Sequence, residues 1–260
     1  MKALAVRQAH RLGLQIGRSL RNDDVARIAA RLWPVVTEKP LIRLGGDADG
    51  GYLVPDDLEG IAACFSPGVA ATATFEEAMI NRSIRCFLAD ASVDSPPIDS
   101  PMIVFDRKFL GVVNDADTTT LDSWVERKMP AGGEFVLQMD IEGAEWAVLL
   151  GASWEVLRSF RIVVVELHWL ERLVDPVTAR LFDACLARLG EHFHVVHAHV
   201  NNCEPLLDFG GVKLPKYLEV TYLRKDRAKV QRYATQFPHP LDHGNLPNIP
   251  DVILPKVFRH

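Results

Sequence analysis

The stretch Gln138-Met139-Asp140-Ile141-Glu142-Gly143-Ala144-Glu145-Trp146 decides the fold of this chain. It follows the apolar run 135–137, typical of a buried strand, and leads into residues 146–150, whose apolar side chains have helical spacing. Three carboxylates therefore cluster where a strand ends and a helix begins, at the edge where open α/β sheets bind ligands. A half-buried carboxylate is costly without a cation, a proton or a ligand. We therefore interpret Asp140 as a residue that takes part in the chemistry of the site. Glu145 can equally be an acid in the first helical turn that interacts favourably with the helix dipole.

The composition is that of an ordinary globular chain. Of its 260 residues 48% are hydrophobic and 24% are charged, which is enough to bury a sizeable core. The net charge of −5, without interleaved basic and aromatic residues, argues against a nucleic-acid partner. The four cysteines form no CxxC pair, which favours reduced thiols and a cytoplasmic location. No segment has the roughly 18 to 20 apolar residues of a membrane span.

Residues 1–39 are expected to form a helical extension. Leu4, Leu12, Ile16 and Leu20 recur at helical spacing among basic side chains. Such a helix could pack on its own domain, lie peripherally on an anionic membrane, or mediate self-association, for example in a homodimer. The segment lacks the uninterrupted apolar centre of a secretory signal. Because the chemical motifs lie beyond residue 41, we expect removal of residues 1–33 to leave the chemistry intact.

Short apolar runs and helical patterns alternate from residue 41 onward. Two final strands have no helix-sized pattern between them, which indicates a mostly parallel sheet with an antiparallel hairpin at its edge. We place a sheet domain at 40–225 and an irregular, proline-rich tail at 226–260, packed on that domain. The expected strands are 61–65, 84–89, 102–105, 135–139, 161–165, 193–199 and 217–223, and helices are expected to start near residues 74, 120, 146 and 177.

Four blocks of the sequence resemble FkbM-type methyltransferases, which are S-adenosylmethionine-dependent O-methyltransferases acting largely on sugars and related natural products. The blocks, which span about Leu41 to Leu223, are Arg43–Tyr52 with DGGY, Ser66–Val69 followed by Phe75-Glu76, Asp140–Trp146 with DIEGAE, and His197–Asn202 with Leu218–Tyr222, similar to HxHxNN and EVTY in the saccharide-modifying branch. The resemblance implies a class I methyltransferase, Rossmann-like fold with a seven-stranded sheet and helices on both faces. One departure is that Gly68 stands alone in a turn that usually holds two or three glycines.

The resemblance also implies S-adenosylmethionine as the cofactor. Asp90 ends the second strand, where nucleotide-binding α/β folds place an acid on the ribose. Ser66 and Gly68 are expected to face the methionyl part, and the Asp-Gly-Gly turn to fold over the site, although such a sequence is also a plain turn signal. The expected cofactor-binding residues are Asp49, Gly51, Tyr52, Ser66, Gly68, Glu76, Asp90 and Ala91.

Methylation of a sugar hydroxyl needs help with deprotonation, because such a hydroxyl is a poor acid. Glu166 and His168 lie two residues apart at the end of the fifth strand, hence on one face of it. By likeness to macrolide-sugar O-methyltransferases that hold magnesium with acids ending the fourth and fifth strands, we predict Mg²⁺ or Mn²⁺ on Asp140, Glu166 and His168. His197 and His199 on the sixth strand are either bases or a hydrogen-bonded structural pair. The expected catalytic residues are Asp140, Glu142, His168, His197 and His199.

The sequence therefore predicts an O-methyltransferase that acts on a sugar hydroxyl of a mono-, oligo- or polysaccharide or a glycolipid. A methyltransferase of a non-sugar natural product is an alternative that leaves the histidine pairs unexplained. A non-catalytic module with the same fold is a second alternative, against which the expected buried charges of Asp140 and Glu166 argue. A nicotinamide-dependent oxidoreductase would need G-x-G-x-x-G after the first strand, and Ser66–Ala71 does not provide it.

Overall fold

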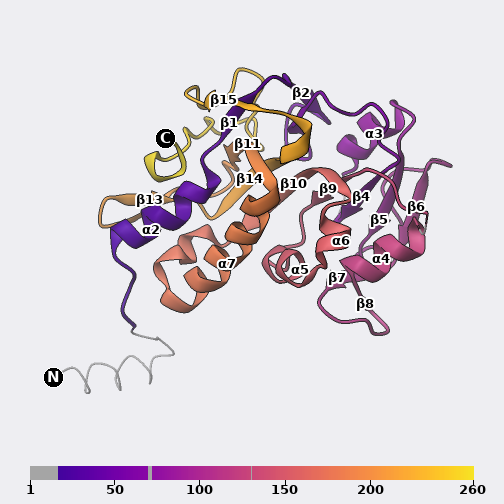
Figure 1. Ribbon diagram of the computed structural model, residues 1–260, viewed down its shortest axis with the longest axis horizontal. Coiled ribbons are helices and arrows are strands. Elements are labelled where there is room, and N and C mark those ends of the chain that lie inside the picture. Colours follow the sequence, from indigo (N-terminus) through magenta and orange to yellow (C-terminus); the bar gives the residue numbers. More distant parts are fainter. Residues whose placement is uncertain (1–16, 70–71, 130) are drawn as a thin grey trace.

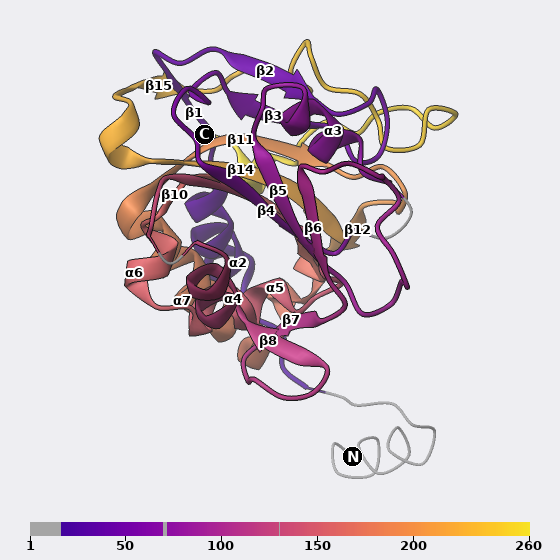
Figure 2. The same cartoon turned by 90° about the vertical axis from the view of Figure 1, so that its right-hand side faces the viewer.

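The computed structural model describes residues 17–69, 72–129 and 131–260. Its centre is a seven-stranded sheet with the order β11-β14-β10-β9-β4-β5-β6 (Figures 1 and 2). Neighbouring strands from β10 to β6 pair in parallel, whereas β14 runs antiparallel between β10 and β11. The predicted α/β architecture with a mostly parallel seven-stranded sheet is confirmed. The strands are β4 (Ala63–Pro67), β5 (Arg85–Ala89), β6 (Ile103–Asp106), β9 (Phe135–Met139), β10 (Phe160–His168), β11 (Phe193–Val200) and β14 (Tyr217–Arg224).

Both faces of the sheet are covered, because side chains alternate along its strands. In β4, for example, Phe65 enters the core on one face and Cys64 the core on the other. Figure 2 shows the two layers on either side of the sheet. One layer holds α2 (Asn22–Ala29), α4 (Leu121–Lys128), α5 (Glu145–Gly151), α6 (Trp154–Leu157) and α7 (Pro176–His192), and the other holds β2 (Leu41–Leu44), β3 (Tyr52–Pro55) and α3 (Thr74–Ile80).

Residues 22–32 are integrated into the main core. Helix α2 buries Val25 and Ile28 in the core that α7 shares, and Asp183 of α7 accepts hydrogen bonds from Arg27 at 3.2 Å and Arg31 at 2.6 Å. After η1 (Ala30–Leu32) the expected helix gives way to strand β1 (Val35–Thr37), which pairs with β15 (Val230–Tyr233) because β-branched residues favour a strand. The helical pattern predicted for residues 1–16 lies outside the described residues. No helix within the described ranges is long and apolar enough to cross a bilayer.

Several short elements were not predicted. Strands of three or four residues are too short to show a hydrophobic period. The tail also contains more regular structure than expected, including β15, and Val252 bridges to Val200 at the end of β11. The remaining elements are β7 (Phe109–Gly111), β8 (Thr118–Thr120), β12 (Leu207–Phe209), β13 (Val212–Leu214), η2 (Leu170–Val174), η3 (Lys225–Arg227) and η4 (Lys256–Phe258).

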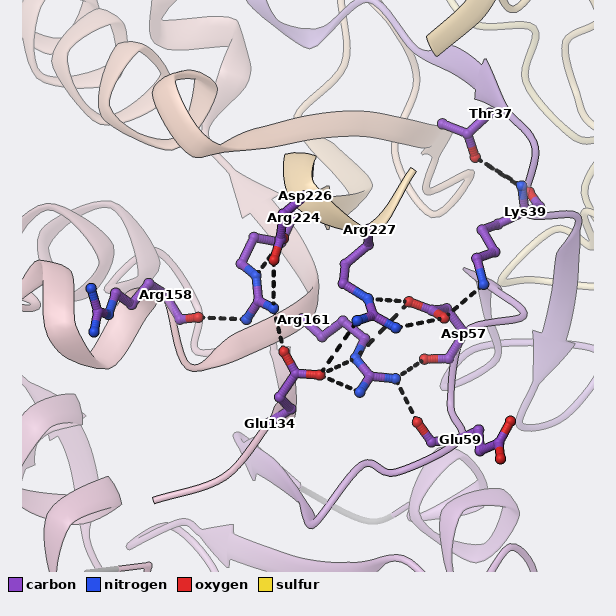
Figure 3. A network of polar contacts seen from close by, with 10 residues as sticks. All are labelled: Thr37, Lys39, Asp57, Glu59, Glu134, Arg158, Arg161, Arg224, Asp226 and Arg227. Atoms are coloured by element: carbon purple, nitrogen blue, oxygen red, sulfur yellow. Dashed lines mark hydrogen bonds and ion pairs between the residues drawn. The ribbon is translucent and has the colours of Figure 1, made fainter. Parts of the chain in front are cut away.

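A network of ion pairs ties β9, β10 and β14 together at the edge where β9 and β10 begin (Figure 3). Arg161, nearly fully buried near the start of β10, donates to Glu134 and to the backbone carbonyls of Asp57 at 2.8 Å and Glu59 at 2.7 Å. Arg227 donates to the Asp57 carboxylate at 2.8 Å. The ion pairs at this edge stabilise the fold. The candidate site lies at the opposite edge, where β9 and β10 end.

Candidate active site

The turn after β4 presses directly against the end of β9. Gly68 has a φ of +85°, and its N–H donates to the carbonyl of Ala89 at 3.0 Å. A Cβ atom at Gly68 would lie 1.5 Å from the backbone oxygen of Asp140, so that no larger residue fits without a backbone shift. The single glycine of this turn therefore stands where two strand ends meet.

Two cavities flank this meeting point, and both are lined by Gly68 and Asp140. The larger has a volume of about 310 Å³ and the smaller about 60 Å³. The two cavities are therefore neighbours that share Gly68 and Asp140 as lining residues. Further lining residues of the larger cavity include Ala89, Asp90, Ser92, Phe109, Ile141 and Glu142, and those of the smaller one include Asp49, Tyr52, Thr74, Glu76 and Gln138.

The larger cavity combines an oriented acid with apolar walls. Asp90 is buried, and its Oδ1 accepts hydrogen bonds from the backbone N–H of Ser92 at 2.7 Å and from its hydroxyl at 2.6 Å. Phe109 is half exposed beside it, and Ile141 lies on the same wall. A carboxylate that can accept hydrogen bonds from ribose hydroxyls, next to an apolar surface that can contact a nucleobase, suits a nucleoside. Ala91, also predicted to bind the cofactor, lies in the chain between Asp90 and Ser92.

The smaller cavity has a polar floor held by a buried hydrogen-bond network. The hydroxyl of Ser66 bonds to the carboxyl group of Glu76 and to the amide oxygen of Gln138, and Gln138 Nε2 lies 3.4 Å from the Tyr52 hydroxyl. Burial raises the pKa of Glu76. The predicted Gly51 shapes the wall rather than lining it, because a Cβ there would lie 2.0 Å from the backbone oxygen of Gly46.

His168 is held in one orientation by Glu145, which is fully buried. Glu145 Oε1 accepts the backbone N–H of His168 at 2.7 Å and lies 2.9 Å from its Nδ1, while Oε2 accepts the N–H of Gly143 at 2.9 Å. A carboxylate on Nδ1 selects the tautomer that carries the proton there and leaves Nε2 free to act. That Nε2 lies 3.3 Å from Glu142 and 3.7 Å from Asp140.

The electrostatics around Asp140 and His168 favour the binding of a cation or the uptake of a proton. Burial raises the pKa of Asp140 to about 7, although His168 opposes the shift, and Glu142 raises it further. Burial lowers the pKa of His168, but Glu145 and the other carboxylates outweigh it and raise the pKa. Asp140 Oδ1 is buried without a hydrogen-bond partner among the described residues. Ligand atoms of Asp140, Glu142 and His168 lie within 4.8 Å of one another, a donor set that suits a divalent cation.

Glu142 adds a sign of local strain at this site. Its φ is +56°, a left-handed conformation that a non-glycine residue adopts at a cost. Its side chain is exposed while its carboxylate still faces His168. The backbone thus turns this acid toward the group formed by Asp140 and His168.

Glu166 lies in a different carboxylate group from Asp140 and His168. It groups with Asp49 and Glu219, with ligand atoms of all three within 4.8 Å of one another. Burial raises the pKa of Glu166, and Asp140 is also close enough to raise it. Asn201 Nδ2 donates to Glu166 Oε1 at 3.2 Å. The structure therefore divides the predicted metal set, and Glu142 takes the place expected for Glu166.

The geometry of His199 and His197 favours the structural alternative. Both ring nitrogens of His199 face acids, Glu219 at 3.0 Å and Asp251 at 2.9 Å. Burial lowers its pKa, but these hydrogen bonds outweigh burial and raise it to about 10, so the ring is already protonated at neutral pH. His197 Nε2 lies 3.0 Å from Asp242, and the residue lines an apolar cavity beneath the tail. The ring of His199, with an acid at each nitrogen, is therefore not arranged as a free proton acceptor.

Sequence reasoning did not identify three residues that shape the site. Glu145 belongs to the motif quoted at the start, but its contact with His168 could not be predicted, because the two residues lie 23 positions apart in the sequence. Asp251, which lies beside His199, and Asn245, whose Nδ2 donates to Glu219 Oε1 at 2.6 Å, belong to the tail, where no pattern indicates contact with a strand end. Their roles follow from the tail crossing the ends of β11 and β14.

Comparison with known proteins agrees with this geometry. Residues 82–209 match the family model described as the methyltransferase FkbM domain. The matched region includes Asp90, Asp140 and His168, and it excludes the Gly68 turn and the tail. No curated protein is significantly similar to the chain. The predicted family is confirmed, and residues 82–209 are an FkbM methyltransferase domain.

Proposed function

We propose that this chain is an S-adenosylmethionine-dependent O-methyltransferase that acts on a sugar hydroxyl, with assistance from a divalent cation. The observation that carries the proposal is the junction at Gly68. Two cavities share Gly68 and Asp140 as lining residues there, and Nε2 of an oriented His168 faces the same carboxylate.

The residues around the junction fit this cofactor. Asp90 in the larger cavity would bind the ribose hydroxyls, and Asp49 and Glu76 in the smaller one would surround the methionyl part. Gly68 lets the turn after β4 lie directly against the end of β9, because a side chain at this position would collide with the backbone of Asp140. The bound cofactor supplies a methyl group already activated on a sulfonium, so the protein must mainly align and deprotonate the acceptor.

Asp140 and His168 are the residues placed to handle the acceptor proton. A pKa of about 7 allows Asp140 to accept a proton near neutral pH, where a general base works best. Glu145 keeps His168 in one tautomer throughout. Asp140, Glu142 and His168 would hold a divalent cation, whose chemistry at this place is to acidify a bound hydroxyl. Asp140 Oδ1, which has no hydrogen-bond partner among the described residues, supports that assignment.

Aromatic side chains next to this group support a sugar acceptor. The ring of Trp169 lies over Gly143, where a Cβ would come within 2.3 Å of it, and the residue remains 37% exposed. Tyr217 packs edge-on against His168 with ring centroids 4.9 Å apart. Amphipathic rings beside convergent polar groups suit a ligand with apolar faces and hydroxyl edges.

The cofactor half is tested with Gly68→Ala, using calorimetric titration with S-adenosylmethionine. We expect no measurable binding by a folded variant, because the added methyl group collides with Asp140. Gly132→Ala is the matched control, because Gly132 has a similar φ of +75° but open space around it. Normal binding by Gly68→Ala would place the cofactor elsewhere.

The acceptor half is tested by screening hexosides and oligosaccharides with methyl-labelled S-adenosylmethionine, with and without chelator. Transfer to a sugar hydroxyl that EDTA abolishes and Mg²⁺ or Mn²⁺ restores is the expected result. Full activity in excess EDTA would contradict the metal and leave Asp140 as a simple base. Transfer to non-sugar hydroxyls only would contradict the sugar assignment.

A further inference from the structure

Two residues with strained backbones follow the neighbouring strands β9 and β10. Glu142 comes shortly after β9 and Trp169 directly after β10, and their φ values are +56° and +64°. Ser83 is the one other non-glycine residue with a left-handed φ in the described part of the chain. Such a conformation is costly for a large side chain and is retained where the surrounding structure enforces it. Two of these residues beside one site therefore indicate that their conformation serves the site.

Glu142 belongs to a tight turn formed by residues 141–144. The N–H of the last residue donates to the carbonyl of the first at 3.2 Å, and both central residues have a positive φ, which is +102° at Gly143. Turns of this kind favour Asn, Asp or Gly at their central positions. The side chain of Glu142 is 87% exposed, and its carboxylate lies 3.3 Å from Nε2 of His168. Because water surrounds this side chain, the direction of its carboxylate depends on the backbone that carries it.

The indole ring of Trp169 packs directly on this turn. A Cβ atom on Gly143 would lie 2.3 to 2.7 Å from three atoms of the ring, Cη2, Cζ2 and Cζ3. The outer part of the indole therefore occupies the space next to this glycine, and the turn cannot move toward it. The guanidinium carbon of Arg172 lies 5.3 Å from the ring centroid, a distance at which a cation and an aromatic ring attract each other.

Hydrogen bonds fix the backbone of Trp169 from several sides. The carbonyl of the residue before it accepts Nε1–H of Trp146 at 2.9 Å, and the N–H of the residue after it donates to the carbonyl of Lys216 at 3.2 Å. Its own carbonyl accepts the N–H of Arg172 at 2.9 Å. These bonds tie the residue to α5 and to the chain just before β14. A strained conformation persists under such constraints, and they make the ring a fixed support for the turn.

We propose that Trp169 is a positioning residue of the candidate active site. Its ring holds Gly143, and with it the 141–144 turn, so that the carboxylate of Glu142 stays directed at Nε2 of His168. This inference deepens the proposed function and rests on it for the effect on methyl transfer. The support of the turn is independent of the reaction and can be measured without it.

Hydrogen exchange of the Gly143 amide in the full chain measures this support. The N–H donates to Glu145 Oε2 at 2.9 Å in the wild type. In Trp169→Ala it should exchange about tenfold faster or more, because the turn loses the ring that packs on it. Trp169→Phe keeps an aromatic ring without the outer part of the indole, so its rate should lie between the two, and it replaces the alanine variant if that variant does not fold. Exchange at the wild-type rate in a folded variant would overturn the proposal.

Trp154→Ala is the matched control for the loss of an indole ring. Trp154 is also partly exposed, but it belongs to α6 and stacks on His192 with ring centroids 3.4 Å apart. This variant should leave the exchange rate of Gly143 unchanged. Equal acceleration in Trp154→Ala and Trp169→Ala would mean that a general loss of stability opens the turn, and it would overturn the proposal.

A double-mutant cycle of methyl transfer tests whether the ring acts through Glu142. In Trp169→Ala, kcat should fall about tenfold or more, while KM and the affinity for S-adenosylmethionine should change less. In the background of Glu142→Gln the same change should have little further effect on kcat, because the carboxylate that the ring positions is already absent.

Two kinetic results would overturn the proposal. A rise in KM at unchanged kcat would assign the ring of Trp169 to acceptor binding, and losses that multiply in the double variant would show that the ring does not act through Glu142. Absence of methyl transfer by the wild-type chain would contradict the proposed function instead, and hydrogen exchange of Gly143 would then decide the role of Trp169 by itself.

Discussion

At the scale of single residues, Glu145 shows how burial decides between two roles that sequence leaves open. An acid in the first helical turn gains about 0.3 to 1 kcal/mol from the helix dipole at an exposed position. Glu145 is instead fully buried, and its carboxylate contacts His168 twice and Gly143 once. Because a buried charge needs such partners, we infer that its main effect is to orient the imidazole.

Glu145→Gln is therefore expected to lower methyl transfer about 10- to 100-fold, the range typical of partners that orient a ligand or catalytic group. The amide keeps the shape but cannot offer two carboxylate oxygens to the N–H groups around it. Cofactor affinity should persist, and kcat should fall more than KM rises. The control is Glu155→Gln, an exposed acid in the first turn of α6, which should retain full activity. Equal effects of the two changes would favour the dipole role for Glu145.

At the scale of elements, helix α2 behaves as part of the core rather than as an appendage. Val25, Ile28, Ala29 and Leu32 are at most 2% exposed and pack in the same cluster as α7. The sequence showed the amphipathic period of this segment but not the surface that it covers. The expectation that residues 1–33 can be removed concerns the chemistry, whereas this packing concerns the stability of the fold.

Removal of residues 1–33 is expected to lower the free energy of unfolding by about 5 kcal/mol or more, since full burial of one Val, Leu or Ile contributes about 1.5 to 3 kcal/mol. That loss is comparable to the whole stability of many domains, so the truncated chain should unfold at a much lower Tm or be insoluble. Thermal unfolding followed by circular dichroism measures it. Arg21→Ala removes an exposed ion pair with Asp24 and should change little. A truncated chain with unchanged Tm would contradict the role of α2.

At the scale of the whole molecule, the sequence predicts the sheet better than the site. Long buried runs such as residues 161–165 indicate a strand wherever they pack, and β10 contains that run. The position of Asp140 and His168 at neighbouring strand ends follows from the same pattern. The separation of Glu166 from them, and the contacts of Asn245 and Asp251, depend on how the tail folds back. Such contacts between distant segments leave no local pattern in a sequence.

The edge opposite the site predicts how the whole fold responds to acid. Burial raises the pKa of Asp57, but hydrogen bonds from Arg227 and Lys39 outweigh it and lower the pKa below its usual value. Glu134 is shifted in the same direction, because Arg224 and Arg161 outweigh its burial. A carboxyl with a depressed pKa contributes stability that is fully present above its unfolded pKa of about 4 and is lost as the pH falls through its folded value. The free energy of unfolding should therefore decline steeply below about pH 4.

Asp57→Asn tests this account through urea unfolding measured from pH 7 to pH 2. The side chain of Asp57 is 5% exposed and faces Lys39, Arg161 and Arg227, so its neutralisation removes a buried partner that these three cations share and should cost about 3 kcal/mol at pH 7. The free energy of unfolding of the variant should also decline less steeply below pH 4. The reason is that Asp57, which takes up a proton more readily in the unfolded chain than in the folded one, is then absent. Asp56→Asn, at the exposed neighbouring position, should change the stability at pH 7 by no more than about 0.5 kcal/mol. A variant with wild-type stability at pH 7 and an unchanged acid slope would mean that the network in Figure 3 is not what holds this edge of the sheet together.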